Sequence, residues 1–264
     1  MDPQSQVSVV IPAFNAGKFI CETLKTIAEQ TILPCEVIVV DDGSSDNTVT
    51  VVEEFSKNNP NLNMRILHEP HNGPGAARNA GVQASKGIWI AFLDSDDHWE
   101  PTKLERMAKA SVQVPEANFL CHNEIHHMLN KSTQEIDYSK GYDPNRSLVD
   151  QLYICNRFST SAVMCRRELI IKSGGFDISL PSAQDYELWI RMSENLRVLF
   201  VKEVLGSYID RTGNISSSKY WHRYIIYHRV LYRHRDKVGK MIRYRVYLRS
   251  FFSLVYHLFC DRIK

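Results

Sequence analysis

Residues 88–97 read Ile-Trp-Ile-Ala-Phe-Leu-Asp-Ser-Asp-Asp, an apolar run that ends in three carboxylates. An apolar run of this length followed by turn-forming residues indicates a buried strand of a parallel sheet. Ligands of open α/β sheets bind at the carboxyl ends of the strands. Three acids at such an edge repel one another, and a divalent cation that also holds a diphosphate would relieve the repulsion. The alternative is a solvated acidic turn before a helix that begins near Pro101.

Two other segments repeat this pattern of an apolar strand followed by polar residues. Residues 37–48 read Val-Ile-Val-Val-Asp-Asp-Gly-Ser-Ser-Asp-Asn-Thr, and residues 7–17 read Val-Ser-Val-Val-Ile-Pro-Ala-Phe-Asn-Ala-Gly. The three strand ends would place polar groups at one rim of one sheet. Asp41, Asp42 and Asn15 could each be a helix cap instead, but three such coincidences are less favoured than a shared ligand.

The first half of the chain alternates between strands and helices. Strands are predicted near residues 7–11, 36–40, 65–68 and 88–93, and helices near 18–30, 46–58, 75–85 and 101–112. This alternation predicts an α/β fold with a mostly parallel central sheet flanked by helices. Further along, we expect strands at 119–121 and 159–165, a polar loop at 130–145, and helices from 148, at 168–173 and at 186–195.

The composition is that of an ordinary globular protein, with 44% hydrophobic and 23% charged residues in a chain of 264. Its six cysteines form no CxxC pair, which favours reduced thiols over a disulfide framework or a zinc site. The first residues lack the basic and apolar character of a secretory leader. No apolar run approaches the roughly 20 residues that span a bilayer.

Six short motifs carry a family resemblance. They are Ile11-Pro-Ala-Phe-Asn15, Asp41-Asp-Gly-Ser44, Asn72-Gly-Pro-Gly-Ala-Ala-Arg-Asn-Ala-Gly81, Leu93-Asp-Ser-Asp-Asp97, Gly174-Gly-Phe-Asp177 and Gln184-Asp-Tyr-Glu-Leu-Trp-Ile-Arg191. Each motif alone is weak, but their order and spacing are specific. Residues 7 to about 218 resemble the inverting family 2 glycosyltransferases, the type that builds bacterial surface polysaccharides. The resemblance implies a Rossmann-like GT-A catalytic domain over 1–218.

The same resemblance implies a UDP-sugar donor, bound in a nucleotide half of about 1–115. The acceptor, a glycan or lipid-linked saccharide, would bind in a half of about 116–218. A carboxylate suits the N3–H donor of uracil, since a buried hydrogen bond to a charged group is costly to lose. The residues expected to hold the nucleotide are Pro12, Ala13, Phe14, Asn15, Asp41, Asp42, Arg78, Asp94 and Ser95. Which of the two neighbouring aspartates contacts the base is open, and Arg78 could also pair with one of them.

Asp94-Ser-Asp96 matches the DxD motif of that family, which implies a Mn²⁺ or Mg²⁺ ion. Asp96 is expected to be the main metal ligand, with Asp94 as a second ligand that lies towards the ribose. Asp97 is a further candidate. Such an ion would act as a Lewis acid on the leaving diphosphate.

Asp185 matches the general base of the family. It would accept the proton of the attacking hydroxyl, and a single displacement would invert the anomeric configuration. The alternatives are a helix cap, since Asp185 lies at or near the start of a predicted helix, and Glu187 as the base. Relatives carry an Arg and a His after the tyrosine equivalent to Tyr208, where Ile209 and Arg211 stand here; Arg211 is therefore the tentative diphosphate ligand.

The charge is unevenly distributed. Residues 219–264 carry twelve Lys or Arg side chains against two acids, a net charge of +10, which leaves −8 for residues 1–218. Interleaved aromatic and basic residues suit helices that lie on an anionic membrane surface. Two ordinary helices that pack back on the catalytic domain are the alternative, and a nucleic-acid site is disfavoured. We expect a cytoplasmic protein, peripheral on the inner face of the membrane, and leave its oligomeric state open.

Two rival functions remain. A nucleotidyltransferase would need a Gly-rich loop with Lys or Arg directly after the first strand, and residues 12–15 do not supply it. A catalytically degenerate protein that binds a glycan or a sugar nucleotide would not need Asp94, Asp96 and Asp185 to be intact.

Overall fold

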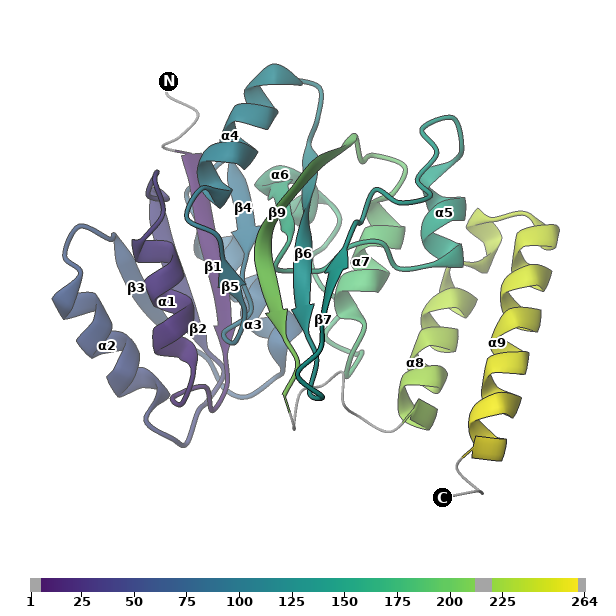
Figure 1. Cartoon of the computed structure of the whole chain (residues 1–264), viewed down its shortest axis with the longest axis horizontal. Helices are drawn as coiled ribbons and strands as arrows, with labels where there is room; N and C mark the ends of the chain where they lie inside the picture. Colours follow the sequence, from purple (N-terminus) through teal and green to yellow (C-terminus); the bar gives the residue numbers. More distant parts are fainter. Residues whose placement is uncertain (1–5, 212–219, 261–264) are drawn as a thin grey trace.

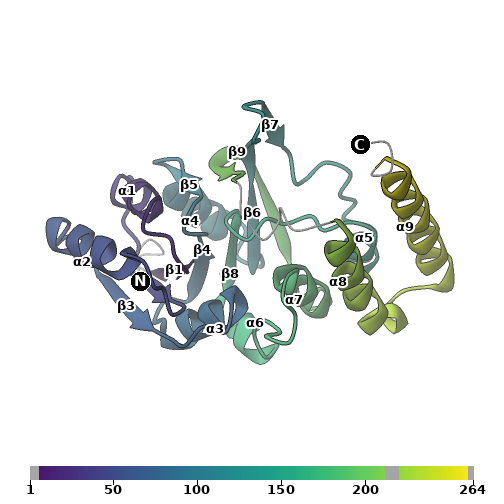
Figure 2. The same ribbon diagram turned by 90° about the horizontal axis from the view of Figure 1, so that it is seen from below.

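The computed structural model describes residues 6–211 and 220–260. In this part of the chain a nine-stranded sheet has the order β3-β2-β1-β4-β8-β6-β9-β5, with β7 paired to β6 (Figure 1). Helices cover both faces of the sheet (Figure 2). The fold is therefore the predicted α/β fold, with a parallel half followed by a mixed half.

The parallel half contains the predicted strands and helices. Its elements are β1 (Val7–Ala13), α1 (Ile20–Ala28), β2 (Glu36–Asp41), α2 (Thr48–Asn58), β3 (Met64–His68), α3 (Pro74–Ala84), β4 (Trp89–Phe92) and α4 (Lys103–Gln113). Strands β1, β2 and β4 are buried along their whole length. Because strands covered on both faces read as continuous apolar runs, the sequence pattern located them.

The mixed half differs more from the prediction. Its elements are β5 (His98–Trp99), β6 (Phe119–His127), β7 (Thr133–Ile136), α5 (Leu148–Ile154), β8 (Val163–Arg166), α6 (Arg167–Lys172), α7 (Gln184–Met192) and β9 (Val198–Ile209). Strand β7 lies within the predicted polar loop. It has no apolar pattern that would reveal it in the sequence, and its pairing with β6 holds it in the sheet. Strands β5 and β9 were not predicted. The first is only two residues long, and the second is mostly half-buried.

Two large apolar clusters lie on the two faces of the sheet. One, which includes Ile20, Leu24 and Met107, fills the space under α1, α2 and α4. The other packs under α5, α6 and α7 and includes Trp189 and Phe176. Because close packing on both faces fixes the positions of the strands, it also fixes the points from which the loops at the strand ends begin.

The second cluster also includes residues of the two C-terminal helices, α8 (Tyr220–Arg233) and α9 (Lys240–Cys260). The Tyr153 hydroxyl donates to the Leu231 carbonyl oxygen at 3.0 Å, and the rings of Tyr186 and Tyr227 stack with centroids 5.7 Å apart. Helix α8 therefore packs on α5 and α7. The predicted boundary at residue 218 lies outside the described residues. No helix in the described ranges is both long and apolar enough to cross a bilayer.

Candidate functional site

The carboxyl ends of β2, β1 and β4 lie side by side because these strands are neighbours in the sheet. The Asp42 N–H donates to the Ala13 carbonyl at 2.8 Å, and the Leu93 N–H donates to the Val10 carbonyl at 3.1 Å. The three polar segments identified in the sequence thus meet at one rim. We refer to the loops that follow these three strands, together with the start of α7, as the rim.

Asn15 fastens two loops of the rim to each other. Its backbone N–H donates to Ser44 Oγ at 2.9 Å, and its side-chain oxygen accepts from the Ser45 N–H at 2.9 Å. The φ of Asn15 is 50°, a left-handed conformation that Asn tolerates better than most residues. Neighbouring Phe14 is 45% exposed and stacks on the His71 ring, with centroids 4.0 Å apart. His71 was not predicted, although it directly precedes the Asn72 motif.

The two aspartates at the end of β2 have different surroundings. Both carboxylate oxygens of Asp42 are engaged by the loop before α3: Oδ1 accepts from the Asn72 N–H at 2.9 Å, and Oδ2 from the Gly73 N–H at 2.9 Å. The His71 ring lies 2.9 Å from the same Oδ2. Asp41 accepts one weaker bond, from the Ser44 N–H at 3.2 Å. Asp42 thus orders a loop, while Asp41 retains the greater capacity to accept a hydrogen bond from a ligand.

Arg78 on α3 forms an ion pair with Asp94, with 2.5 Å between Nη2 and Oδ1. The sequence had allowed a pair with Asp41 or Asp42 instead. Gly75 permits this placement, because a Cβ atom there would lie 2.6 Å from the Gln184 amide oxygen. The absent side chain lets α3 approach the start of α7 closely, which brings Arg78 near the predicted base.

Asp94 and Asp96 form the acidic part of the rim. Burial, and then the neighbouring charge of Asp94, raise the pKa of Asp96 to about 6. A bound cation would offset the cost of ionising Asp96 beside Asp94. The pair therefore fits a metal ion whose remaining ligands are substrate phosphates. Within residues 6–211 and 220–260, no cluster of three or more potential metal ligands exists. A Mn²⁺ or Mg²⁺ ion that is held by two carboxylates and a substrate diphosphate does not require a cluster of three protein ligands.

Asp97 lies in the interior and is not a free metal ligand. Its Oδ2 accepts from the Ser161 hydroxyl at 2.6 Å, and its Oδ1 accepts from the Ile209 N–H at 3.1 Å. The same Ser161 oxygen accepts from the Asp94 N–H at 3.1 Å. Asp97 and Ser161 therefore fix the acidic loop to β9 and to the segment before β8. No sequence pattern pointed to Ser161.

We expect Ser161→Ala to weaken both the fold and the site. The change leaves a buried Asp97 oxygen and the Asp94 N–H without a partner, which should cost about 1–3 kcal/mol of unfolding free energy. Donor affinity should fall as well, because the acidic loop loses its anchor. Ser111→Ala is the matched control, since that buried hydroxyl donates only within its own helix. Thermal melts and nucleotide titrations check this, and an unchanged donor affinity would contradict the anchoring role.

Asp185 lies in the first turn of α7, as predicted. The residue two positions before it, Ala183, has φ 56°, a left-handed conformation that is unusual for alanine and is typical of functional sites. Burial raises the pKa of Asp185, and the Arg78 guanidinium partly opposes this shift. In the described part of the chain, no other side chain hydrogen-bonds to its carboxylate. Backbone N–H groups of Asp185 and Tyr186 also stabilise the carboxylate. Asp185 is thus held near Arg78 without a side-chain hydrogen-bond partner among the described residues.

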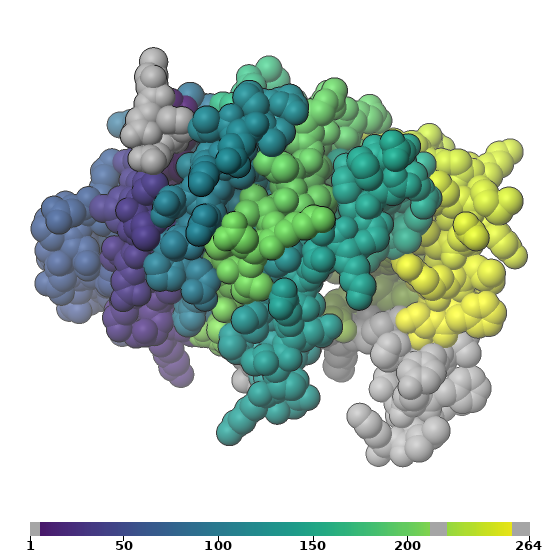
Figure 3. All heavy atoms as spheres, turned by 45° about the horizontal axis from the view of Figure 1, so that its top comes forward, coloured from purple at the N-terminus to yellow at the C-terminus, as the bar shows by residue number. Residues whose placement is uncertain are grey.

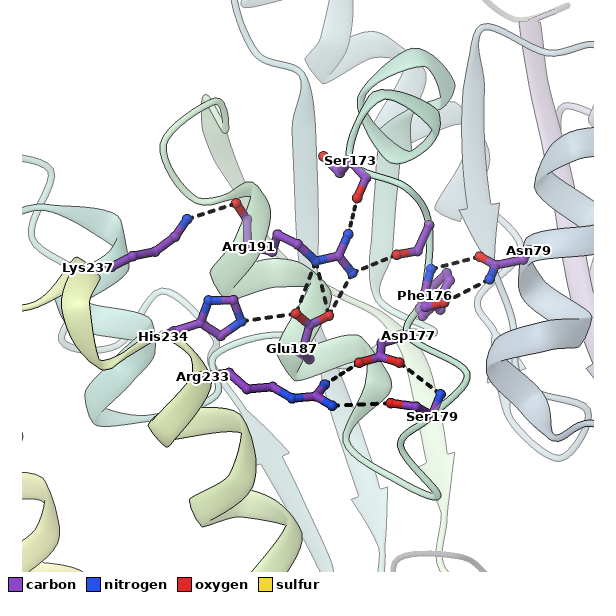
Figure 4. Close-up of polar contacts among 11 residues, drawn as sticks. Asn79, Ser173, Phe176, Asp177, Ser179, Glu187, Arg191, Arg233, His234 and Lys237 are labelled. Carbon is purple, nitrogen blue, oxygen red and sulfur yellow. Dashed lines mark hydrogen bonds and ion pairs between the residues drawn. The ribbon is translucent and has the colours of Figure 1, made fainter.

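Glu187, the alternative base, is fully engaged elsewhere (Figure 4). Its Oε2 lies 2.6 Å from Arg191 Nη2, and its Oε1 lies 3.0 Å from His234 Nε2. Arg191 in turn donates to the carbonyls of Ser173 and Gly175. The Glu187 carboxylate therefore ties α7 to the turn after α6 and to the C-terminal helices, and has no capacity left for a substrate.

Arg211 reaches the acidic loop from the end of β9. Its Nη2 donates to the Asp96 carbonyl at 2.9 Å, and its guanidinium lies 4.2 Å from the centre of the Phe19 ring. This cation is therefore beside Asp96, where the diphosphate was predicted. The rest of the segment that departs from the family pattern, residues 212–216, lies outside the described residues.

Comparison with known proteins identifies the family. The model described as "Glycosyl transferase family 2" matches residues 8–172. A hyaluronan synthase from Pasteurella multocida is 32% identical over 225 residues, which are 81% of this chain and 21% of that protein. The chain spans between 19% and 61% of the length of the first curated relatives that it matches.

Solved structures share the fold. TarS residues 1–349 from S. aureus, in complex with UDP-GlcNAc, has a TM-score of 0.64 at 22% identity, over 84% of this chain and 65% of that one. The mannosyltransferase PcManGT from Pyrobaculum calidifontis, in complex with GDP-Man and Mn²⁺, has a TM-score of 0.66 at 20% identity. That match covers 94% of this chain and 71% of the other. These similarities confirm the predicted GT-A fold.

Proposed function

The chain belongs to glycosyl transferase family 2, and we propose that it transfers a hexose or N-acetylhexosamine from a UDP-sugar to a glycan or lipid-linked glycan acceptor, with inversion. The observation that carries the proposal is the gathering of Arg78, Asp94, Asp96 and Asp185 at one rim of the sheet. This set would supply charge compensation for a diphosphate and, in Asp185, a carboxylate that can accept the proton of an incoming hydroxyl.

The nucleotide would bind across the ends of β1 and β2. We assign Asp41 to the base, because the Asp42 carboxylate is already satisfied by the loop before α3. The exposed Phe14 ring and its partner His71 provide an aromatic surface beside the base. Pro12 and Ala13 would contribute backbone and shape, and Asn15 would act by holding the loop. The TarS and PcManGT structures contain different nucleotides, UDP-GlcNAc and GDP-Man. The choice of uridine for this chain therefore rests on the family resemblance.

The acidic loop would hold the diphosphate. Asp96 and Asp94 would bind Mn²⁺ or Mg²⁺, which when bound would neutralise charge that develops on the leaving UDP. Arg211 would add a positive charge beside Asp96. Arg78 already pairs with Asp94 and would orient this carboxylate towards the ribose or the metal. Ser95, half-buried between the two acids, would line the nucleotide site.

Asp185 would act on the acceptor. Its carboxylate would accept the hydroxyl proton while the hydroxyl oxygen attacks the anomeric carbon from the face opposite UDP. The bond to the UDP oxygen then breaks as the new glycosidic bond forms, so an α-linked donor gives a β-linked product. A nucleotidyltransferase is not favoured, since the Gly-rich basic loop is missing after β1. A degenerate binding protein is not favoured either, because the acids are intact and gathered.

A panel of sugar nucleotides tests the proposal. We expect UDP-glucose or UDP-N-acetylglucosamine to release UDP in the presence of Mn²⁺ and GDP-mannose to be inert, with all turnover lost on addition of EDTA. Anomeric coupling constants in the NMR spectrum of the product should show inversion. Preference for GDP-mannose would overturn the donor assignment, and a product with retained configuration would overturn the assignment of Asp185.

A further inference from the structure

Helix α9 presents an uncovered apolar face. Five large side chains recur at the spacing of one helix face, and they are between 41% and 71% exposed. They are Met241, Tyr244, Leu248, Phe251 and Phe252. We call them the outer face of α9. The helix lies at one end of the molecule in both ribbon views, and Figure 3 shows it (yellow) at the edge of the space-filling view.

The opposite side of α9 explains why the outer face is held outward. Val246 is buried in the core cluster, and Ile242 packs against that cluster. The Arg249 guanidinium donates to the Ile154 carbonyl at the end of α5, and the Tyr247 hydroxyl lies 3.4 Å from the Tyr153 hydroxyl. Because these contacts fix the rotation of the helix, the five apolar side chains cannot turn inward.

The charge around the outer face is positive. Helix α9 carries four basic residues and no acidic one. Arg243 lies 3.8 Å from Asp236 and Arg249 is held by α5, but the exposed Lys240 and Arg245 pair with no carboxylate among the described residues. An isologous dimer through this face would bring identical cations together, which disfavours a second copy as the partner.

We propose that the outer face of α9 docks on an anionic lipid bilayer. An apolar row with aromatic residues and flanking Lys and Arg is the pattern of a helix that lies in the membrane interface. Burial of the row removes apolar surface from water, and the unpaired cations meet lipid phosphates. The structure assigns this contact to α9, because its exposed apolar row has five members on one face, whereas the large apolar side chains exposed on α8 are Trp221, Ile225 and Tyr232.

Vesicle flotation of the full chain tests the proposal. Wild type should bind vesicles of equal parts phosphatidylcholine and phosphatidylglycerol, should bind phosphatidylcholine alone poorly, and should lose affinity as salt shortens the Debye length to about 8 Å or less. Lys240→Gln with Arg245→Gln should weaken binding about 30-fold, since each basic side chain near an anionic leaflet contributes roughly 1 kcal/mol. Leu248→Gln with Phe252→Gln should weaken it at least about 10-fold.

Matched variants elsewhere separate a specific face from general surface effects. Val112→Gln removes an apolar side chain that is similarly exposed on α4, and Lys57→Gln with Lys109→Gln removes two exposed cations. Neither variant should change binding by more than about twofold, the effect of a few tenths of a kcal/mol. Equal losses in these controls would overturn the proposal, as would an absence of binding at low salt.

Self-association is a separate outcome. Sedimentation velocity over a range of protein concentrations would reveal a dimer, and a dimer that Leu248→Gln with Phe252→Gln abolishes, without vesicle binding, would assign the face to a second copy and overturn the membrane proposal. Vesicle binding is measured without turnover, so its failure is distinguishable from a failure of the proposed transfer reaction. Turnover on a soluble acceptor should be unchanged in all four variants.

Discussion

Asp185→Asn is expected to lower kcat by about 10²–10⁴-fold, the usual contribution of a positioned general base. The amide keeps the shape of the side chain but cannot accept the acceptor's proton. Donor affinity should stay within a few-fold of wild type, because the proposed role places Asp185 at the reacting hydroxyl rather than at the nucleotide. Initial rates with saturating donor, together with donor titrations, check this prediction.

The pH profile gives an independent check. Burial raises the pKa of Asp185, and the protonated carboxyl group cannot act as a base. The wild-type rate should therefore fall as the pH decreases through this raised pKa, and the residual rate of Asp185→Asn should lack that acidic limb. Asp150→Asn on α5 is the control for an amide substitution at a helix start. A near-normal kcat would reduce Asp185 to a helix-capping role.

Asp96→Ala is expected to abolish metal-dependent transfer and to weaken UDP binding in the presence of Mn²⁺. Loss of a residue that only supports a metal ligand costs 10–100-fold in affinity, so loss of a direct ligand should cost at least about 100-fold. The measurement is a Mn²⁺ titration of UDP binding, repeated with Asp96→Asn. Unchanged wild-type turnover in chelator would contradict the metal role.

The same variant should not destabilise the fold. The folded-state pKa of Asp96 is raised to about 6. The protonated side chain therefore contributes to folding stability at low pH, and this contribution is lost as the pH rises through about 6. At neutral pH the ionised side chain therefore costs stability in the metal-free protein. The Tm of Asp96→Ala near pH 7 should equal or exceed that of wild type. A large fall in Tm would indicate a structural role for Asp96 instead.

The sequence predicted best where one physical signal dominates. Strands β1, β2 and β4 are buried on both faces, so their continuous apolar runs located them and the acids that follow them. Strand β9 carries both buried and exposed side chains, with an irregular register opposite His122–Glu124 in β6, and no simple period describes it. Strand β7 is polar and depends on its partner, which a local pattern does not reveal.

The candidate site shows the same limit. Asp94, Asp96 and Asp185 were found because their chemistry and motif context are explicit in the sequence. Whether Asp41 or Asp42 is available to a ligand depends on N–H groups some 30 residues later, which only the folded chain brings together. Ser161 was missed for the same reason, since an isolated serine becomes an anchor only through contacts with Asp94 and Asp97.

The bond from the Ile209 N–H to Asp97 has a consequence for synthesis on the ribosome. It closes across a separation of 112 residues, and β5 beside the acidic loop pairs with β9 alone in the sheet order. The parallel half can emerge and fold early, because N-terminal units usually fold first. The acidic loop, by contrast, receives its last anchors when β9 has been translated. A nascent chain limited to the family-matched residues 8–172 would carry the DxD motif without a finished donor site. The proposed transfer activity should therefore arise only after β9 has been translated.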